Sequence, residues 1–106
     1  MFLVGDKMNY RFIGWCHDPK ENHDKVWAVI IINNKYGDCK VATIWGRRGK
    51  TLQSKIIETT SWDLDTLVRS KQKKGYESYS KSQLDNVYPN FEQDLEMTTS
   101  WAMLKS

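Results

Sequence analysis

The residue types best suited to chemistry stand together in one run, Trp45-Gly46-Arg47-Arg48-Gly49. An indole ring can stack on a sugar or an unpaired base, and a guanidinium group can bind a phosphate through two parallel hydrogen bonds. Glycine lets the backbone approach a phosphate closely because it has no side chain. The run is therefore a candidate nucleic-acid surface. The alternative is that Trp45 belongs to the core and that the arginines merely keep a hairpin tip soluble.

No arrangement of side chains in the sequence predicts catalysis. The serines lack a Gly-x-Ser-x-Gly nucleophile elbow. Residues 46–51 end like a phosphate-binding loop, but too few residues separate the glycines and the segment leads into a predicted strand instead of a helix. Asp63 and Asp65 are explained by the start of a helix, where negative charge is favourable. We therefore expect no enzyme, no catalytic residue, no cofactor and no small-molecule substrate.

The two cysteines, Cys16 and Cys39, are predicted to be reduced, buried thiols. Together with His17 and His23 they have none of the spacings usual for zinc pairs, so no metal is expected. No apolar run approaches the roughly 18 residues that span a bilayer, and the opening residues 1–4 are too short for a signal-peptide core. These features favour a soluble protein without a membrane partner. The expected location is cytoplasmic or otherwise intracellular, and nuclear if the source is eukaryotic.

The net charge of +3 is distributed unevenly along the chain. Residues 1–34 are neutral, residues 35–81 hold eleven basic against five acidic side chains, and residues 82–106 carry a net charge of −3. A basic middle of this kind attracts phosphate or an acidic partner. A solvated face without a special purpose is the alternative.

Hydrophobic alternation predicts strands over residues 8–16, 25–32, 39–45 and 54–59, with a short edge strand near 76–79. In the first strand, Tyr10 and Phe12 alternate with Arg11 and Ile13. The segment 25–32 is apolar on both faces, which is typical of a strand in the middle of a sheet that is covered on both sides. Residues 25–32 and 39–45 are expected to pair as an antiparallel hairpin.

One long helix is predicted over residues 62–74, with Ser61 as its cap and Gly75 at its end. Leu64, Leu67 and Val68 form an apolar stripe that should lie on the sheet. The expected fold is α+β, an antiparallel sheet of about four to five strands with one covering α-helix. A length of 106 residues suits a single domain. The segment after Tyr79 remains unassigned, and the order of the tail after Glu92 stays open.

Several motifs resemble the WGR domain, a family named after a Trp-Gly-Arg tripeptide and found in DNA-break-sensing poly(ADP-ribose) polymerases and many bacterial proteins. The resemblance covers roughly residues 20–91. In chain order, the similar motifs are Lys25-Val26-Trp27, Trp45-Gly46-Arg47-Arg48-Gly49, Gln53, the helix end Lys71-Gln72-Lys73-Lys74-Gly75-Tyr76, and Tyr88-Pro89-x-Phe91. This resemblance also implies an antiparallel sheet crossed by one helix.

The resemblance implies binding to double-stranded DNA at breaks, as in the DNA-repair members of the family. There the motif Trp packs against a sugar at a strand end and the motif Arg bridges DNA and neighbouring domains, roles that would fall to Trp45 and Arg47. Two positions depart from the family: Leu52 stands where a second Gly is common, and Val87 stands where some polymerases have a Lys before Tyr-Pro. The polymerase catalytic domain is absent from this sequence, so no ADP-ribose transfer follows.

The leading hypothesis is a free-standing WGR-like module that binds nucleic acid, above all duplex DNA ends or nicks. Trp45 would stack beside Gly46, and Arg47 and Arg48 would contact phosphates. Four lysines would widen the basic surface: Lys50, Lys71, Lys73 and Lys74. The alternative is a protein-interaction module, a small regulator or inhibitor of a partner protein that does not bind DNA.

Overall fold

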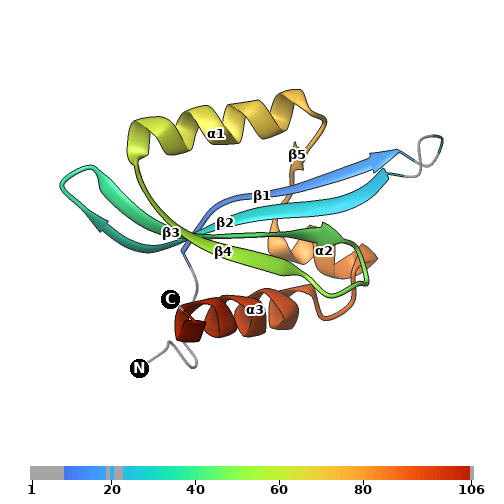
Figure 1. Cartoon of the computed structure of the whole chain (residues 1–106). Coiled ribbons are helices and arrows are strands. Elements are labelled where there is room, and N and C mark those ends of the chain that lie inside the picture. The colour runs from blue at the N-terminus through green and yellow to red at the C-terminus, as the bar shows by residue number, and fades with distance from the viewer. Residues whose placement is uncertain (1–8, 19, 21–22, 106) are drawn as a thin grey trace.

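A computed structural model describes residues 9–18, 20 and 23–105, except for the side chains at 23, 81, 82, 85 and 105. Met8, the predicted start of the first strand, lies outside the described residues. The described residues form five strands and three helices (Figure 1): β1 (Asn9–Asp18), β2 (His23–Lys35), β3 (Asp38–Arg47), β4 (Gln53–Thr60), α1 (Ser61–Lys73), β5 (Glu77–Ser78), α2 (Lys81–Val87) and α3 (Phe91–Lys105).

The strands form one antiparallel sheet in the order β4-β3-β2-β1-β5. The predicted α+β class is confirmed, as are the hairpin of β2 with β3 and the short edge strand β5. In the hairpin Ala28 lies opposite Ile44, and the pairing runs from Lys35 and Asp38 to Lys25 and Arg47. Within the described part of the chain, no helix is long and apolar enough to cross a membrane.

The core has two halves, one on each face of the sheet, because β2 is apolar on both sides. Figure 1 shows α1 over one face and α2 with α3 over the other. On the α1 face, Trp27 and Val29 pack with Leu64 and Val68 of α1. The other cluster joins Val26, Ala28 and Ile30 of β2 to the C-terminal segment, and it also includes Leu84, Tyr88, Phe91 and Leu95. The prediction that the central strand is covered on both faces is therefore confirmed.

Helix α1 has the predicted length, but it begins and ends one residue earlier than predicted, at Ser61 and Lys73. Its N-cap is Thr60, not Ser61: the Thr60 hydroxyl accepts a hydrogen bond from the backbone N–H of Asp63 at 3.1 Å. The backbone N–H of Ser61 instead donates to the carbonyl of Gly37, which ties the helix to the β2–β3 turn. Gly75, at φ +106°, ends the helix in the left-handed conformation that favours glycine.

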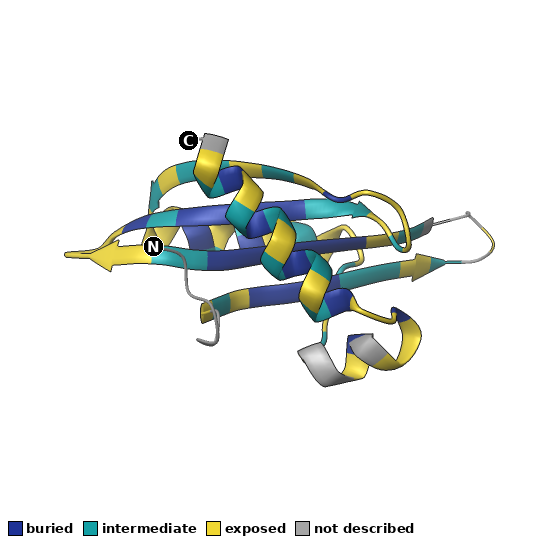
Figure 2. Ribbon diagram, turned by 90° about the horizontal axis from the view of Figure 1, so that it is seen from below, coloured by how far each residue is buried: buried dark blue, intermediate teal, exposed yellow. Residues whose placement is uncertain are grey.

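The expectation of a single long helix is wrong, because α3 spans 15 residues. Its buried face contains Phe91, Leu95 and Thr99, and Figure 2 shows the helix lying across the sheet. Its opposite face carries Met97 and Trp101, which are exposed. Because apolar side chains lie on both faces of α3, its sequence lacks the alternation of apolar and polar residues that predicts an amphipathic helix.

The first strand contains a β-bulge that the sequence analysis did not predict. The register between β1 and β2 shifts between Tyr10 and Phe12. As a result, Tyr10 packs on the α3 side of the sheet and Phe12 on the α1 side, although simple alternation places them on one face. Both cysteines have free thiols. Cys39 is buried as predicted, whereas the predicted burial of Cys16 is wrong, because it is only half-buried.

Candidate nucleic-acid interface

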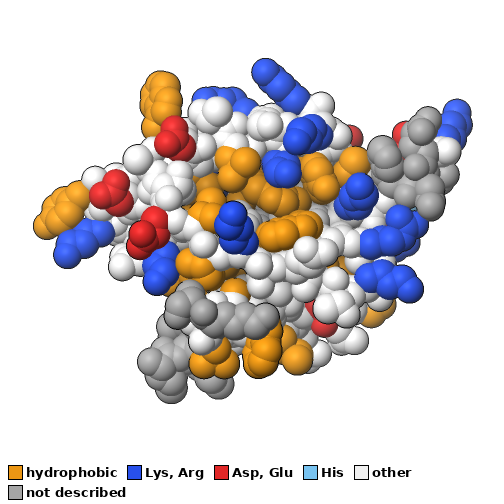
Figure 3. Space-filling model, viewed as in Figure 1, with side chains coloured by type: hydrophobic (Ala, Val, Ile, Leu, Met, Phe, Trp, Pro, Cys, Tyr) orange, Lys and Arg blue, Asp and Glu red, His pale blue; other side chains and the backbone are white. Residues whose placement is uncertain are grey.

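An aromatic hollow lies on the α1 face of the sheet, at the end of β3 that contains the Trp-Gly-Arg run. Its volume is about 310 Å³. We call it the tryptophan hollow, and its lining residues are Trp27, Thr43, Trp45, Lys55, Ile57, Leu67, Lys71 and Tyr76. Figure 3 shows apolar side chains gathered at the centre of this face, with Lys and Arg side chains around them. The hollow thus combines aromatic surface with positive charge.

Strand register explains why these side chains meet. Trp27 of β2 lies opposite Trp45 of β3, and Thr43 of β3 lies opposite Lys55 of β4. Residues opposite each other in an antiparallel pair point to the same face, and so do residues two apart along a strand. Trp27 is only 4% exposed, whereas Trp45 is half-buried. Trp27 therefore lies at the floor of the hollow and Trp45 nearer its rim.

Lys71 brings positive charge to the hollow from helix α1. Its Nζ lies 5.4 Å from the centroid of the Trp27 ring, within the range of a cation–π interaction. Partial burial, and then the nearby charge of Lys74, lowers the pKa of the Lys71 ammonium. A phosphate entering the hollow would oppose both effects on the pKa, because its negative charge favours the protonated ammonium.

Arg47 and Lys25 extend the basic surface beyond the hollow. They lie opposite each other at the end of the β2–β3 pair, and both are exposed. Lys25 is two residues from Trp27 on β2, and Arg47 is two residues from Trp45 on β3. Alternation therefore places each of them on the same face as the neighbouring tryptophan. Like charges placed opposite each other are unfavourable in a sheet, so this pair is suited to a partner that carries negative charge.

Arg48 points to the other side of the hairpin and is held by internal contacts. Its Nε donates to the Asp24 carboxylate at 2.8 Å and its Nη1 donates to the Val87 carbonyl at 2.7 Å. Its guanidinium also lies 5.6 Å from the centroid of the Trp15 ring, and Trp15 donates to Asp24 at 2.8 Å. These contacts join the tip of the β3–β4 hairpin to β1, β2 and the end of α2.

Replacing Arg48 by glutamine should lower the free energy of unfolding by about 1–3 kcal/mol, the usual range for hydrogen bonds to charged groups. Burial raises the pKa of the Asp24 carboxyl, but the hydrogen bonds from Trp15 and Arg48 and the charge of Arg48 outweigh it, so the pKa is lowered overall. The stabilisation that the ionised Asp24 carboxylate gives the fold is therefore present above the ordinary pKa of Asp, about 4. It is lost as the pH falls through the lowered pKa of Asp24.

Urea unfolding at pH 7 and at pH 3 measures this effect. The parent should lose more stability between the two pH values than Arg48→Gln does. Arg69→Gln, which removes one charge from the exposed face of α1, is the matched control and should stay within about 0.5 kcal/mol of the parent. Equal stability of the Arg48 variant and the parent at pH 7 would contradict the structural role of Arg48.

The turn after Arg47 depends on two glycines and on Leu52. The backbone N–H of Lys50 donates to the carbonyl of Arg47 at 3.0 Å, with Gly49 at φ +79°. A Cβ on Gly46 would lie 3.1 Å from the Leu52 side chain, so this position favours glycine. Leu52, which departs from the family pattern, is buried in the core cluster on the α3 side. In this structure the leucine at position 52 therefore adds core packing beneath the β3–β4 hairpin.

The predicted site residues fall into three groups. Trp45, Arg47 and Lys71 share the α1 face, and Lys73 and Lys74 are exposed at the adjoining end of α1. Arg48 is held in internal contacts, as described above. Lys50 borders a separate hollow of about 310 Å³ beside α3, together with Asp94 and Met97.

Four residues of this face were missed by sequence reasoning: Lys25, Trp27, Lys55 and Tyr76. Trp27 and Lys25 were noticed only as part of a strand motif. Their nearness to Trp45 depends on the register of β2 against β3, which alternation alone does not set. The register of Lys25 against Arg47 identifies Lys25 and Trp27 as neighbours of this end of β3. Lys55 depends on the register of β4 against β3, and Tyr76 on how α1 packs over the sheet.

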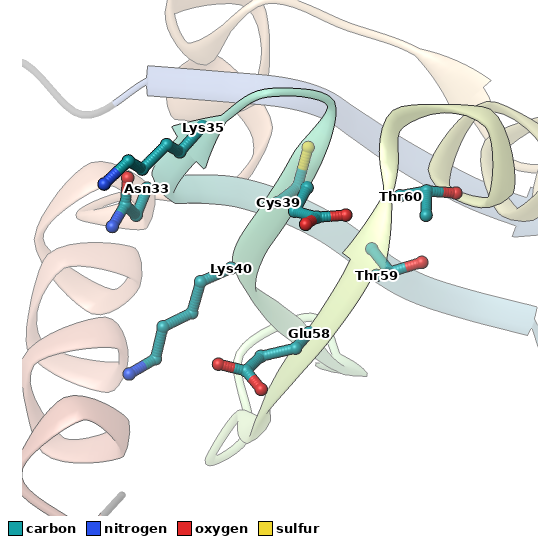
Figure 4. Close-up of a pocket in the computed structure, with 8 residues that line it drawn as sticks. Asn33, Lys35, Cys39, Lys40, Glu58, Thr59 and Thr60 are labelled. Carbon is teal, nitrogen blue, oxygen red and sulfur yellow. The ribbon is translucent and has the colours of Figure 1, made fainter.

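A polar hollow of about 430 Å³ lies at the opposite end of the sheet, and Figure 4 shows several of its side chains on neighbouring strands. It contains two basic residues, Lys35 and Lys40, and two acidic residues, Asp38 and Glu58. It has no aromatic lining and its charges balance, so it lacks what a nucleic acid requires. Among the side chains that the structure describes, no three of His, Cys, Asp and Glu gather as a metal site.

The fold is that of a small α+β module, and the tryptophan hollow brings aromatic and basic side chains together on one face of its sheet. A comparison with protein families matches residues 15–83 to the WGR domain. The matched segment covers well over half of the chain, which therefore belongs to the WGR domain family. WGR domains are binding modules and not catalytic ones. Comparisons with curated proteins and with solved structures give no match. The Tyr88-Pro89-x-Phe91 motif lies beyond the matched segment, and in this structure Tyr88 and Phe91 are core residues.

Proposed function

We propose that this chain binds duplex DNA at strand ends or nicks, through the tryptophan hollow and the exposed pair Lys25 and Arg47. The observation that carries the proposal is the gathering of Trp45 with basic side chains from three separate elements on one face of the sheet. We further propose that the chain has no catalytic activity of its own and acts inside the cell, where its two free thiols would remain reduced.

The chemistry of a strand end suits this face. An end or a nick exposes a terminal sugar and base that continuous duplex hides by stacking, and it is flanked by phosphates on both strands. Trp45 supplies a flat apolar surface for the sugar, while Lys55 and Lys71 lie beside it for the phosphates. Arg47 has the planar donor geometry that binds phosphate through two hydrogen bonds.

Arg47→Ala tests this proposal. In fluorescence anisotropy with a labelled nicked duplex, the variant should bind more weakly by about 1–3 kcal/mol, the range for a charge-assisted contact. Lys73→Ala, at the exposed end of α1, should weaken binding less and flatten the dependence of log K on log salt by about one unit. Arg69→Ala is the control of equal charge change. If Arg47→Ala folds normally and binds as the parent does, the proposal fails.

A second candidate function, docking of another protein without DNA binding, is favoured by the outer face of α3. Met97, Trp101 and Leu104 form an apolar stripe there, and Trp101 is 59% exposed. The stripe borders a groove of about 590 Å³ against the start of β4, the open edge strand of the described sheet. An extended segment of a partner could pair with the β4 backbone and bury an apolar side chain in this groove.

Trp101→Glu separates the two candidates, because Trp101 lies on α3, beneath the face of the sheet opposite the tryptophan hollow. If protein docking is the function, affinity capture followed by mass spectrometry should recover a partner with the parent and lose it with Trp101→Glu. The parent should then show no DNA affinity at low salt. Recovery of the same partners by parent and variant would contradict docking at this groove.

A further inference from the structure

The tryptophan hollow has two partly exposed aromatic side chains, Trp45 and Tyr76, above the buried ring of Trp27. Trp45 comes from β3 and Trp27 from β2, whereas Tyr76 lies just after α1. Its apolar lining is completed by Ile57 and Leu67. A volume of about 310 Å³ with partly exposed aromatic side chains in its lining can take one planar aromatic group.

We propose that the hollow holds one unpaired nucleobase at a DNA strand end, so that the chain prefers ends with a single-stranded extension to blunt ends. This inference rests on the proposed function and adds the base to the sugar contact. A base that stacks on an aromatic ring gains about 1–3 kcal/mol, and only an unpaired base can leave the duplex at little cost. A blunt end must first break a base pair to fill the hollow.

The polar groups of the hollow suit the backbone of the extension. Lys55 of β4 and Lys71 of α1 both line the hollow, and Lys71 Nζ already lies close to the Trp27 ring. A base resting on the aromatic lining would bring its own phosphates close to these two cations. Both cations act as charges on phosphate and do not distinguish one base from another.

The hollow also predicts little preference among the four bases. The Thr43 hydroxyl is engaged, because it donates to the Lys55 carbonyl at 3.2 Å. Recognition of base identity requires donors and acceptors placed against the base edges, whereas stacking accepts every base. Selectivity should therefore depend on whether a base is present and unpaired, and not on which base it is.

The test compares three DNA duplexes with the unaltered protein: blunt, with a one-nucleotide extension, and with the same extension carrying an abasic tetrahydrofuran residue. The abasic extension keeps the phosphate charge and removes only the base. Anisotropy at fixed low salt should show about 10-fold tighter binding of the base-bearing extension than of the other two. With 2-aminopurine as the unpaired base, binding should also quench its fluorescence through stacking. Trp45→Ala should abolish the difference between base-bearing and abasic DNA.

The outcomes separate this inference from the proposed function. Equal affinity for the base-bearing and abasic extensions, or tighter binding of the blunt duplex, overturns the base-holding role while binding to DNA ends stands. Absence of binding to all three duplexes overturns both. Since the comparison changes the DNA and not the protein, it does not depend on whether Trp45→Ala remains folded.

Discussion

Replacing Phe91 by alanine should lower the free energy of unfolding by about 3–5 kcal/mol, the range for truncating a buried Phe. Phe91 is fully buried, lies at the start of α3 and packs against Tyr88 with ring centroids 5.1 Å apart. Its ring joins α2 and α3 to the sheet in the cluster that also contains Leu52 of the β3–β4 hairpin. Loss of the ring would therefore leave a cavity beneath the hairpin that carries the interface.

Urea unfolding followed by circular dichroism measures this change. Leu104→Ala truncates an exposed side chain of the same helix and should stay within about 0.5 kcal/mol of the parent. The comparison also shows whether the chain beyond residue 83, where the family match ends, belongs to the same folding unit. A Phe91→Ala protein as stable as Leu104→Ala would contradict the packing of α3 described above.

Reversing both cations of the tryptophan hollow, in the double variant Lys55→Glu with Lys71→Glu, should reduce DNA affinity by roughly 100-fold or more, since each charged contact is worth about 1.5–3 kcal/mol. The two side chains come from β4 and α1, and both line the hollow. Negative charges there would repel the phosphates of the DNA. Anisotropy with a nicked duplex at low salt gives the affinity.

The matched control reverses Lys35 and Lys40, at the opposite end of the sheet. Both double variants change the net charge by the same amount, so a difference between them reports the place of the charges and not the total. Circular dichroism melting would verify that each variant remains folded. Equal losses of affinity in the two variants would show that DNA is attracted by the overall charge, and the hollow would lose its assigned role.

Most of the sheet could be predicted from the sequence because its signals are local. The two-faced apolar pattern of residues 25–32 fixed β2 at the centre, and Gly75 and the apolar stripe from Leu64 to Val68 located α1. Helix α3 could not be predicted in the same way. Its exposed face carries Met97, Trp101 and Leu104, so the contrast between a buried and a solvated side is missing from its sequence.

The site was predicted only as far as a single segment allowed. The Trp-Gly-Arg run lies at the end of the sheet where the tryptophan hollow is, and Trp45 lines that hollow. Arg47 is the last residue of β3, however, whereas Arg48 lies in the turn that follows, and its side chain makes contacts elsewhere. Arg48 meets Asp24 across the fold, a contact that no local pattern reveals. Lys55 joins the hollow through cross-strand register, which local pattern likewise leaves open.

The central claim, that this face binds DNA where a strand is interrupted, is tested most directly by competition. A labelled nicked duplex bound to the protein is displaced with unlabelled circular DNA of one sequence, either nicked or closed, at two salt concentrations. The nicked circle should compete at least about 10-fold better, with affinity for both circles falling steeply as salt rises. Equal competition by nicked and closed circles, or no binding of the labelled duplex at low salt, would contradict the claim.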